Sequence, residues 1–69
     1  MSNHVYKSVE ITGSSPEGVT QAIDTAVQKA SKTLRNLDWF EVISMRGQIA
    51  AGQVAHYQVT MKVGFRLED

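Results

Sequence analysis

The two side chains of this chain that are best suited to binding a ligand are an indole, Trp39, and an amide, Gln58. Trp39 is the single tryptophan, and its indole can either fill a hydrophobic core or stand exposed as a surface on which a planar ligand stacks. The amide of Gln58 can offer a donor and an acceptor to one ligand edge, or it can stay solvated on a strand. The elements that position these residues decide between the alternatives.

The residue types of common catalytic and metal sites are scarce. The chain has no cysteine, which excludes disulfides and thiolate ligands, and its two histidines, His4 and His56, are too few for a metal cluster. Ser14 and Ser15 have no base at a suggestive spacing, and the glycine-rich phosphate-binding motifs are absent. We therefore expect no catalytic residues, no metal ligands and no enzymatic activity.

Length and charge restrict the class of protein further. The 69 residues make one expected domain, 1–69, and a domain of this size buries only about 60% of its unfolded surface, so we expect oligomerisation to stabilise it. Seven basic and seven acidic side chains balance, which argues against binding to nucleic acid or to an anionic membrane. No apolar run approaches about 18 residues and the N-terminus lacks signal-peptide features, so we expect a cytoplasmic protein.

The first half of the chain predicts a strand followed by one long helix. Residues 5–12 alternate between apolar and polar side chains, as in a half-buried strand. Apolar side chains then recur at three- and four-residue steps, which predicts a helix of about 20 residues, roughly 30 Å long, that starts near Pro16. Asn36 is suited to a left-handed residue at the C-terminal end of this helix.

The start of this helix can be capped in two ways. Ser15 can cap it with Pro16 in the first helical position, or Ser14 and Glu17 can form a capping box. The two alternatives move the start of the helix by only one residue, and the sequence does not decide between them.

The second half of the chain predicts a hairpin of two strands, 39–50 and 53–67, joined by the two residues between them. With a two-residue loop, Glu41 lies opposite Lys62, which is a favourable cross-strand pair. A three-residue loop would set Glu41 against Met61, so the two-residue register is preferred. From Tyr57 to Leu67, the odd-numbered residues of the last strand are apolar and form the face that the helix covers.

This register assigns Trp39 to the open face of the sheet, the face that the helix does not cover, opposite Gly64. The same face is predicted to carry three more apolar residues of that strand and three polar residues of its partner: Ile43, Met45 and Ile49, with His56, Gln58 and Thr60. An apolar patch there would mark a binding or assembly surface. By parity Arg46 falls on the helix side, opposite Tyr57, so it must reach the helix's edge or lie by a bulge, as at Gly47.

Together these elements predict an α+β fold with the order β-α-β-β. The helix returns the chain, so the strand at 39–50 runs parallel to the strand at 5–12, and the strand at 53–67 runs antiparallel to both. The greatest antiparallel pairing puts that last strand in the middle of a three-stranded antiparallel sheet. The two outer strands are then edges, which invite contacts with other subunits.

Four stretches of the sequence carry a family resemblance that covers nearly the whole chain: 6–15 (Tyr-Lys-Ser-Val-Glu-Ile-Thr-Gly-Ser-Ser), 37–42 (Leu-Asp-Trp-Phe-Glu-Val), 46–47 (Arg-Gly) and 56–67 (His-Tyr-Gln-Val-Thr-Met-Lys-Val-Gly-Phe-Arg-Leu). Together they resemble the dodecins, small flavin-binding proteins of about this length. The part of the resemblance that is specific to the family is Asp-Trp-Phe-Glu-Val in combination with the Tyr-Gln and Gly-Phe-Arg-Leu elements. Any one of these elements alone would be weak evidence for the family.

The resemblance implies a hollow homododecamer in which the sheet of each subunit partly wraps round its helix, with flavins bound in pairs between subunits. It implies that two copies of Trp39 bracket the stacked flavins, and that Gln58 hydrogen-bonds the isoalloxazine edge. It also implies storage, buffering and photoprotection of FMN or riboflavin. Gln58 lies about six residues, roughly 20 Å, along the strand from the partner of Trp39, so we expect the two residues to reach one flavin only from different subunits.

The family pattern gives roles to six other residues. It implies that Arg46 and Arg66 contact the ribityl phosphate of FMN or a neighbouring nucleotide, for which the guanidinium fork is suited. Three further residues align with positions near the ligand: Tyr6, Thr33 and Asp38. Lys29 is a candidate contact for a second anionic ligand such as coenzyme A. The two arginines could instead be surface charges. Tyr6, Thr33 and Asp38 could instead be a strand-packing, a helix-surface and a turn residue, in that order.

The leading hypothesis is therefore a non-catalytic flavin carrier or buffer whose sites form on self-assembly. A protein of a different class would be a structural or nucleic-acid-binding sheet platform, against which the zero net charge and the single exposed aromatic argue. A flavin enzyme is the third hypothesis, and it would need a proton donor and a substrate pocket that the sequence does not offer. A yellow protein with quenched flavin fluorescence would favour the first.

Overall fold

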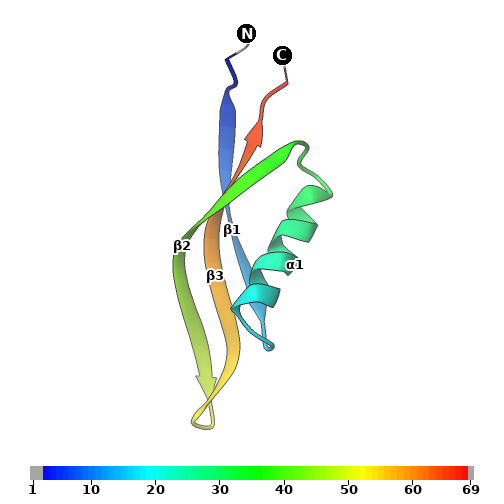
Figure 1. The fold of residues 1–69 in the computed structure, drawn as a ribbon. Coiled ribbons are helices and arrows are strands. Elements are labelled where there is room, and N and C mark those ends of the chain that lie inside the picture. The colour runs from blue at the N-terminus through cyan, green and yellow to red at the C-terminus, as the bar shows by residue number, and fades with distance from the viewer. Residues whose placement is uncertain (1–2, 69) are drawn as a thin grey trace.

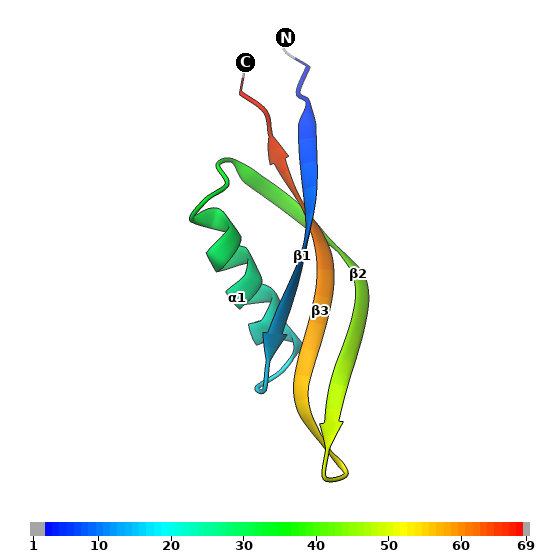
Figure 2. The same cartoon turned by 180° about the vertical axis from the view of Figure 1, so that it is seen from behind.

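The fold consists of one helix packed on one face of a three-stranded sheet (Figures 1 and 2). The computed structural model describes residues 3–68, and its elements are strand β1 (Tyr6–Ser15), helix α1 (Val19–Ser31), strand β2 (Leu37–Ala50) and strand β3 (Gln53–Arg66). The strand order is β1-β3-β2, and both pairings are antiparallel. The predicted α+β fold, with the last strand in the middle of the sheet, is confirmed.

The connection from β1 to α1 differs from the prediction. Strand β1 continues past residue 12, because Ser14 and Ser15 still pair with β3. The Oγ atom of Ser15 then accepts a hydrogen bond of 3.0 Å from the backbone N–H of Glu17, which closes a short turn. The helix begins after Gly18, and no side chain caps it. Both predicted caps are therefore wrong, since the two serines belong to the strand and the turn.

Helix α1 has 13 residues and is about 20 Å long, so it is shorter than predicted. Hydroxyl groups close its C-terminal end: Ser31 Oγ donates to Gln28 O at 2.7 Å, and Thr33 Oγ1 donates to Ala30 O at 3.4 Å. Such side-chain bonds compete with the backbone bonds that would continue a helix. Asn36 has the predicted left-handed conformation, with φ 64°, but it lies in the loop before β2 and not at the helix end.

The core lies between α1 and the two strands β1 and β3. It is formed by five buried side chains: Ala22, Ala26, Val59, Met61 and Val63. The alanines allow a close approach of the helix, and Gly13 of β1 makes room for it. A Cβ atom on Gly13 would lie 2.9 Å from the Cβ atom of Ala26 and would overlap the carbonyl oxygen of Ala22. Small residues on both elements therefore determine how closely the helix packs on the sheet.

The β2–β3 hairpin has the predicted register near both of its ends. Its loop residues, Ala51 and Gly52, both have positive φ angles, 53° and 75°, as in the two-residue turns that match the twist of a hairpin. Far from the loop, Glu41 lies opposite Lys62, as predicted. The two-residue loop and the position of Glu41 opposite Lys62 are therefore both confirmed.

Between its ends the hairpin register is shifted by one residue. Ile43 of β2 and Ala55 of β3 have no partner in the ladder, and these two bulges compensate each other. In the shifted part, polar residues of β2 pair with polar residues of β3: Ser44 with Thr60, Arg46 with Gln58 and Gln48 with His56. The bulge at Ile43 inverts the alternation of β2, so its polar side chains lie on the open face.

The bulges correct the predicted faces of two apolar residues. Met45 pairs with Val59, a core residue on the helix side of the sheet, and Ile49 pairs with Val54. Alternation along β2 from Met45 places Ile49 on the helix side as well. The prediction that Met45 and Ile49 share the open face with Trp39 is therefore wrong.

The bulges also correct the position of Arg46. It lies opposite Gln58 and not opposite Tyr57, so Arg46 and Gln58 share the open face. Of the two predicted explanations for Arg46, the helix's edge or a bulge, the bulge is the one that applies. This bulge lies at Ile43, however, and not at Gly47.

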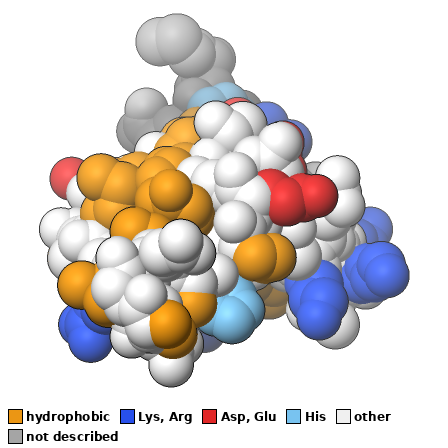
Figure 3. Space-filling view, turned by 90° about the horizontal axis from the view of Figure 1, so that it is seen from below, with side chains coloured by type: hydrophobic (Ala, Val, Ile, Leu, Met, Phe, Trp, Pro, Cys, Tyr) orange, Lys and Arg blue, Asp and Glu red, His pale blue; other side chains and the backbone are white. Residues whose placement is uncertain are grey.

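On the helix side, β2 carries a row of apolar side chains beside the helix, called the β2 stripe: Phe40, Val42, Met45 and Ile49. Their exposed fractions range from 46% to 73%. The hairpin extends beyond α1 in a molecule that measures 55 × 20 × 14 Å (Figures 1 and 2). In the view from the hairpin end, hydrophobic side chains gather on one side (Figure 3). Exposed apolar surface of this kind marks a site of assembly or binding.

Candidate ligand-stacking site

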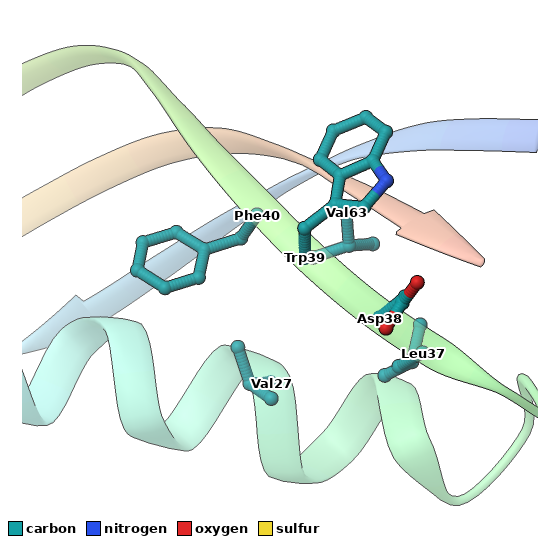
Figure 4. Close-up of a pocket in the computed structure, with 6 residues that line it drawn as sticks. All are labelled: Val27, Leu37, Asp38, Trp39, Phe40 and Val63. Carbon is teal, nitrogen blue, oxygen red and sulfur yellow. The ribbon is translucent and has the colours of Figure 1, made fainter. Parts of the chain in front are cut away.

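Trp39 lies near the start of β2, directly after a bulge at Asp38 that interrupts the ladder with β3. It is opposite Gly64, and its indole lies on the far side of β2 from α1 (Figure 4). The residue is 42% exposed and does not belong to the buried core. The predicted open-face position of Trp39 is therefore confirmed, and its indole is accessible to a ligand.

Gly64 lies directly beneath this indole. A Cβ atom on Gly64 would overlap Cε2 and Cζ2 of Trp39, so the ring occupies the space that a side chain would need. No role for Gly64 was predicted. The predicted register did set this glycine opposite the tryptophan, and an aromatic ring covering a strand glycine is a recurrent cross-strand arrangement.

A small apolar hollow lies beside Trp39, between α1 and the start of β2 (Figure 4). Its volume is about 150 Å³, and six residues line it: Val27, Leu37, Asp38, Trp39, Phe40 and Val63. Pockets for drug-sized ligands have volumes of about 300–1,000 Å³, so this hollow is too small to hold a three-ring ligand by itself. Most of the lining was not predicted, because it comes from three elements that only the fold brings together.

Four other predicted site residues gather at the same end of the sheet as Trp39. Tyr6 of β1 pairs with Arg66 of β3, two residues along from the partner of Trp39. Arg66 and Asp38 line one polar hollow of about 170 Å³, and Thr33 and Arg66 line a second, more apolar hollow of about 250 Å³. The structure therefore brings an aromatic surface, a carboxylate, two hydroxyls and a guanidinium to one end of the molecule.

Two hydrogen bonds tie this end of β3 to the loop between α1 and β2. The backbone N–H of Arg66 donates to Asn36 O at 3.1 Å, and Asn36 Nδ2 donates to Arg66 O at 3.3 Å. The left-handed conformation of Asn36 accompanies both contacts. The backbone of Arg66 is thereby held in place while the residue stays exposed.

Gln58 and Arg46 form a second group, in the middle of the sheet. Gln58 is half-buried between Ser14 of β1 and Arg46 of β2, which are its partners on either side. It lies six positions from Gly64 (64 − 58), which at about 3.3 Å per residue is roughly 20 Å along β3. The structure therefore does not bring Gln58 to Trp39 within one chain, as expected from the sequence.

The open face between these two groups is polar. Glu10 of β1 and Glu41 of β2 flank Lys62 of β3, so one cation lies between two carboxylates across the sheet. In the next row, the hydroxyls of Thr12 and Thr60 form a hydrogen bond of 3.0 Å. The apolar patch predicted for this face is therefore absent from this part of it.

Lys29 lies apart from both groups. It is exposed in the last turn of α1 and does not line the hollows around Trp39 and Arg66. Over residues 3–68, no three histidine or carboxylate side chains lie together as a metal site would require. The same part of the chain contains no helix that is long and apolar enough to span a membrane.

Comparisons with known proteins agree with this architecture. The dodecin family model matches residues 5–68. A dodecin from Thermus thermophilus is 55% identical over 65 residues, which cover 94% of this chain and 94% of that protein. The solved structure of dodecin from Streptomyces davaonensis is 62% identical with a TM-score of 0.94, and the match covers 99% of this chain and 100% of that one. Dodecin from Streptomyces coelicolor also gives 62% identity and a TM-score of 0.94, over 100% of this chain and 99% of that one. A family match over nearly the whole sequence, with relatives this similar in sequence and fold, means that the chain belongs to the dodecin family.

Proposed function

We propose that this protein binds, stores and buffers a flavin, FMN or riboflavin, in the cytoplasm without catalysing a reaction. The observation that carries the proposal is the position of Trp39, whose indole lies on the open face, over Gly64, and is accessible to a ligand. An indole stacks favourably on an electron-poor isoalloxazine, with about 0.5–1.5 kcal/mol beyond the burial of area. Membership of the dodecin family supports a flavin as the ligand.

Stacking on Trp39 would also let the protein protect the bound flavin from light-driven reactions. At van der Waals contact an indole can transfer an electron to an excited flavin, and the charge then recombines without light emission or further chemistry. The bound flavin would return to its ground state before it reacts with its surroundings. Quenched fluorescence of the bound flavin is the signature that this role requires.

The flavin site of the proposal forms between copies of the chain. Trp39 and Gln58 are too far apart along the sheet to reach one ring system from one subunit. Two symmetry-related chains can place one indole on each side of a stacked pair of flavins. Gln58 of a neighbouring chain can then offer its amide donor and acceptor to the pyrimidine edge.

The β2 stripe is the proposed driving force for this assembly. Burying exposed apolar side chains contributes about 25 cal/mol for each Å² removed from water. Residues 3–68 bury five apolar side chains within the subunit, and a core this small needs that contribution. Closed symmetric assemblies bury such a surface in every copy. Family membership favours a hollow homododecamer as the closed form.

The remaining site residues have proposed roles that follow their positions. Arg46 and Arg66 both lie on the open face and are candidates for the ribityl phosphate of FMN, which guanidinium groups bind well. Three residues near Trp39 complete the wall of the site: Tyr6, Thr33 and Asp38. Lys29 is exposed on the helix, so it is a candidate for a second anionic ligand such as coenzyme A, bound away from the flavin.

Titration of flavin-free protein with FMN and with riboflavin tests the proposal, with molar mass measured by light scattering on the same samples. We expect saturable quenching of flavin fluorescence by an assembled species, and a large loss of affinity in Trp39→Ala. An assembled protein that quenches neither flavin would refute it. Retardation of oligonucleotides by a colourless protein would instead support the sheet-platform alternative, and steady reduction of bound flavin by a nicotinamide cofactor would support an enzyme.

A further inference from the structure

The orientation of the Trp39 indole depends on the residue beneath it. We infer that Gly64 is a positioning residue of the ligand site, because its lack of a side chain lets the indole lie against β3. The ligand in this inference rests on the proposed flavin function, whereas the role of Gly64 toward the indole rests on the geometry alone.

The space around Gly64 explains why a glycine stands there. Within residues 3–68, the glycines with positive φ are Gly18 and Gly52, so the backbone conformation of Gly64 is open to other residues. A Cβ atom at position 64, however, would lie 2.7 Å from Cδ2 of Trp39 and would overlap two other atoms of the ring. Glycine inside a strand weakens it, and it often marks the close approach of another group. Here that group is the indole.

Trp39, and not β3, is the part that would move if a methyl group were added. Gly64 lies in the central strand and pairs with Ser8 on one side and Trp39 on the other, so a shift of its backbone would disturb both ladders. Its neighbour Val63 is 1% exposed and belongs to the core, which also resists movement. The indole lies on an outer strand and is 42% exposed, so it can turn into solvent.

A methyl group at position 64 should therefore spoil the stacking surface and leave the fold intact. The indole would stand away from the sheet in more than one orientation, and a stacking ligand would have to fix it in a single orientation. Preorganisation of this kind raises affinity by lowering the ordering that binding requires. Gly64 would thus determine how strongly Trp39 binds its ligand without touching the ligand itself.

The test compares Gly64→Ala in two backgrounds, the natural sequence and Trp39→Ala. In the natural background we expect unchanged molar mass and far-ultraviolet circular dichroism, but a reduced near-ultraviolet signal of Trp39 and about tenfold weaker FMN binding, the scale of one lost aromatic contact. In the Trp39→Ala background we expect Gly64→Ala to cause no further loss of affinity, because no indole is left to displace. Such non-additivity indicates direct coupling between two residues.

Three results would overturn the inference: an unchanged near-ultraviolet signal together with unchanged affinity, an equal loss of affinity in both backgrounds, or misfolding in both backgrounds. Misfolding of Gly64→Ala that Trp39→Ala relieves would support it, since the clash would then be with the indole. If even the natural protein binds neither flavin, the proposed function fails. The near-ultraviolet signal then still decides whether Gly64 orients Trp39.

Discussion

Replacing Trp39 with alanine should weaken flavin binding far more than it weakens the fold. The side chain lies outside the buried cluster, on the opposite face of the sheet from α1, so its removal leaves the packing of helix on sheet in place. A ligand stacked on the indole covers the surface that is now exposed. Trp39→Ala therefore separates the contribution of this residue to binding from its contribution to folding.

The size of the loss follows from that exposed surface. A tryptophan side chain presents up to ~250 Å², and the 42% that is exposed is about 100 Å². Covering it contributes about 2.5 kcal/mol at ~25 cal/mol per Å². Aromatic stacking adds ~0.5–1.5 kcal/mol. The sum of about 3–4 kcal/mol is an upper value and corresponds to an affinity lower by roughly 100- to 1,000-fold.

The assay is a fluorescence titration of FMN with the natural protein, Trp39→Phe and Trp39→Ala. Phenylalanine keeps a smaller ring, so its dissociation constant should lie between the other two. Thermal denaturation without flavin, and molar mass by light scattering, serve as controls for folding and assembly. If Trp39→Ala lowers the melting temperature and the molar mass in parallel with affinity, the residue is structural and the reasoning is refuted.

Three further predictions concern other parts of the molecule. Gln58→Ala should lower flavin affinity by about tenfold, on the scale of one or two hydrogen bonds, with unchanged molar mass, and an unchanged dissociation constant would exclude its role. Met45→Asp, a charge placed in the β2 stripe, should give a smaller species in light scattering; a full-sized assembly would mean that the stripe is not an interface. Ala51→Asn should raise the melting temperature by about 4–8 °C at equal protein concentration, because asparagine tolerates the positive φ that costs alanine about 1 kcal/mol. An unchanged melting temperature would argue against strain in that turn.

The arrangement of the elements could be predicted because its signals are local. The alternation of β3 and the helical spacing before it identify each element from neighbouring residues alone. The ends of α1 could not be predicted in this way. Ser15 bonds to Glu17 and Thr33 bonds to Ala30, so each end is decided by a competition among backbone and side-chain partners that differ little in free energy.

The bulges in the hairpin left a trace in the sequence that strict alternation overlooks. From Glu41 onward, the polar side chains of β2 are Glu41, Ser44, Arg46 and Gln48. The first spacing is three residues, and the next two spacings are two residues each. That extra residue is the bulge at Ile43. The register at both ends of the hairpin does not reveal it, because the second bulge restores the pairing before the loop.

The candidate site could be predicted where it depends on one strand pair. The open-face position of Trp39 and its distance from Gln58 follow from register and rise per residue. The hollow beside Trp39 could not be predicted, since Val27 of α1 and Phe40 of β2 line it together. Their placement around one hollow depends on how the loop around Asn36 turns the chain, and no local pattern encodes it.

In the proposed assembly, β2 would have a different role on each of its faces. Its helix side carries the β2 stripe, beside a helix that packs on β1 and β3, whereas its open face presents Trp39 and Arg46. Assembly would bury the first face, and a flavin would cover part of the second. Because the complete site would exist only between chains, flavin would bind the assembled form and not the separate one. By mass action, flavin at about 100 times its dissociation constant would stabilise the assembly by ~2.7 kcal/mol for each site. Flavin binding and assembly would then stabilise each other, so the bound flavin would help to keep the oligomer assembled.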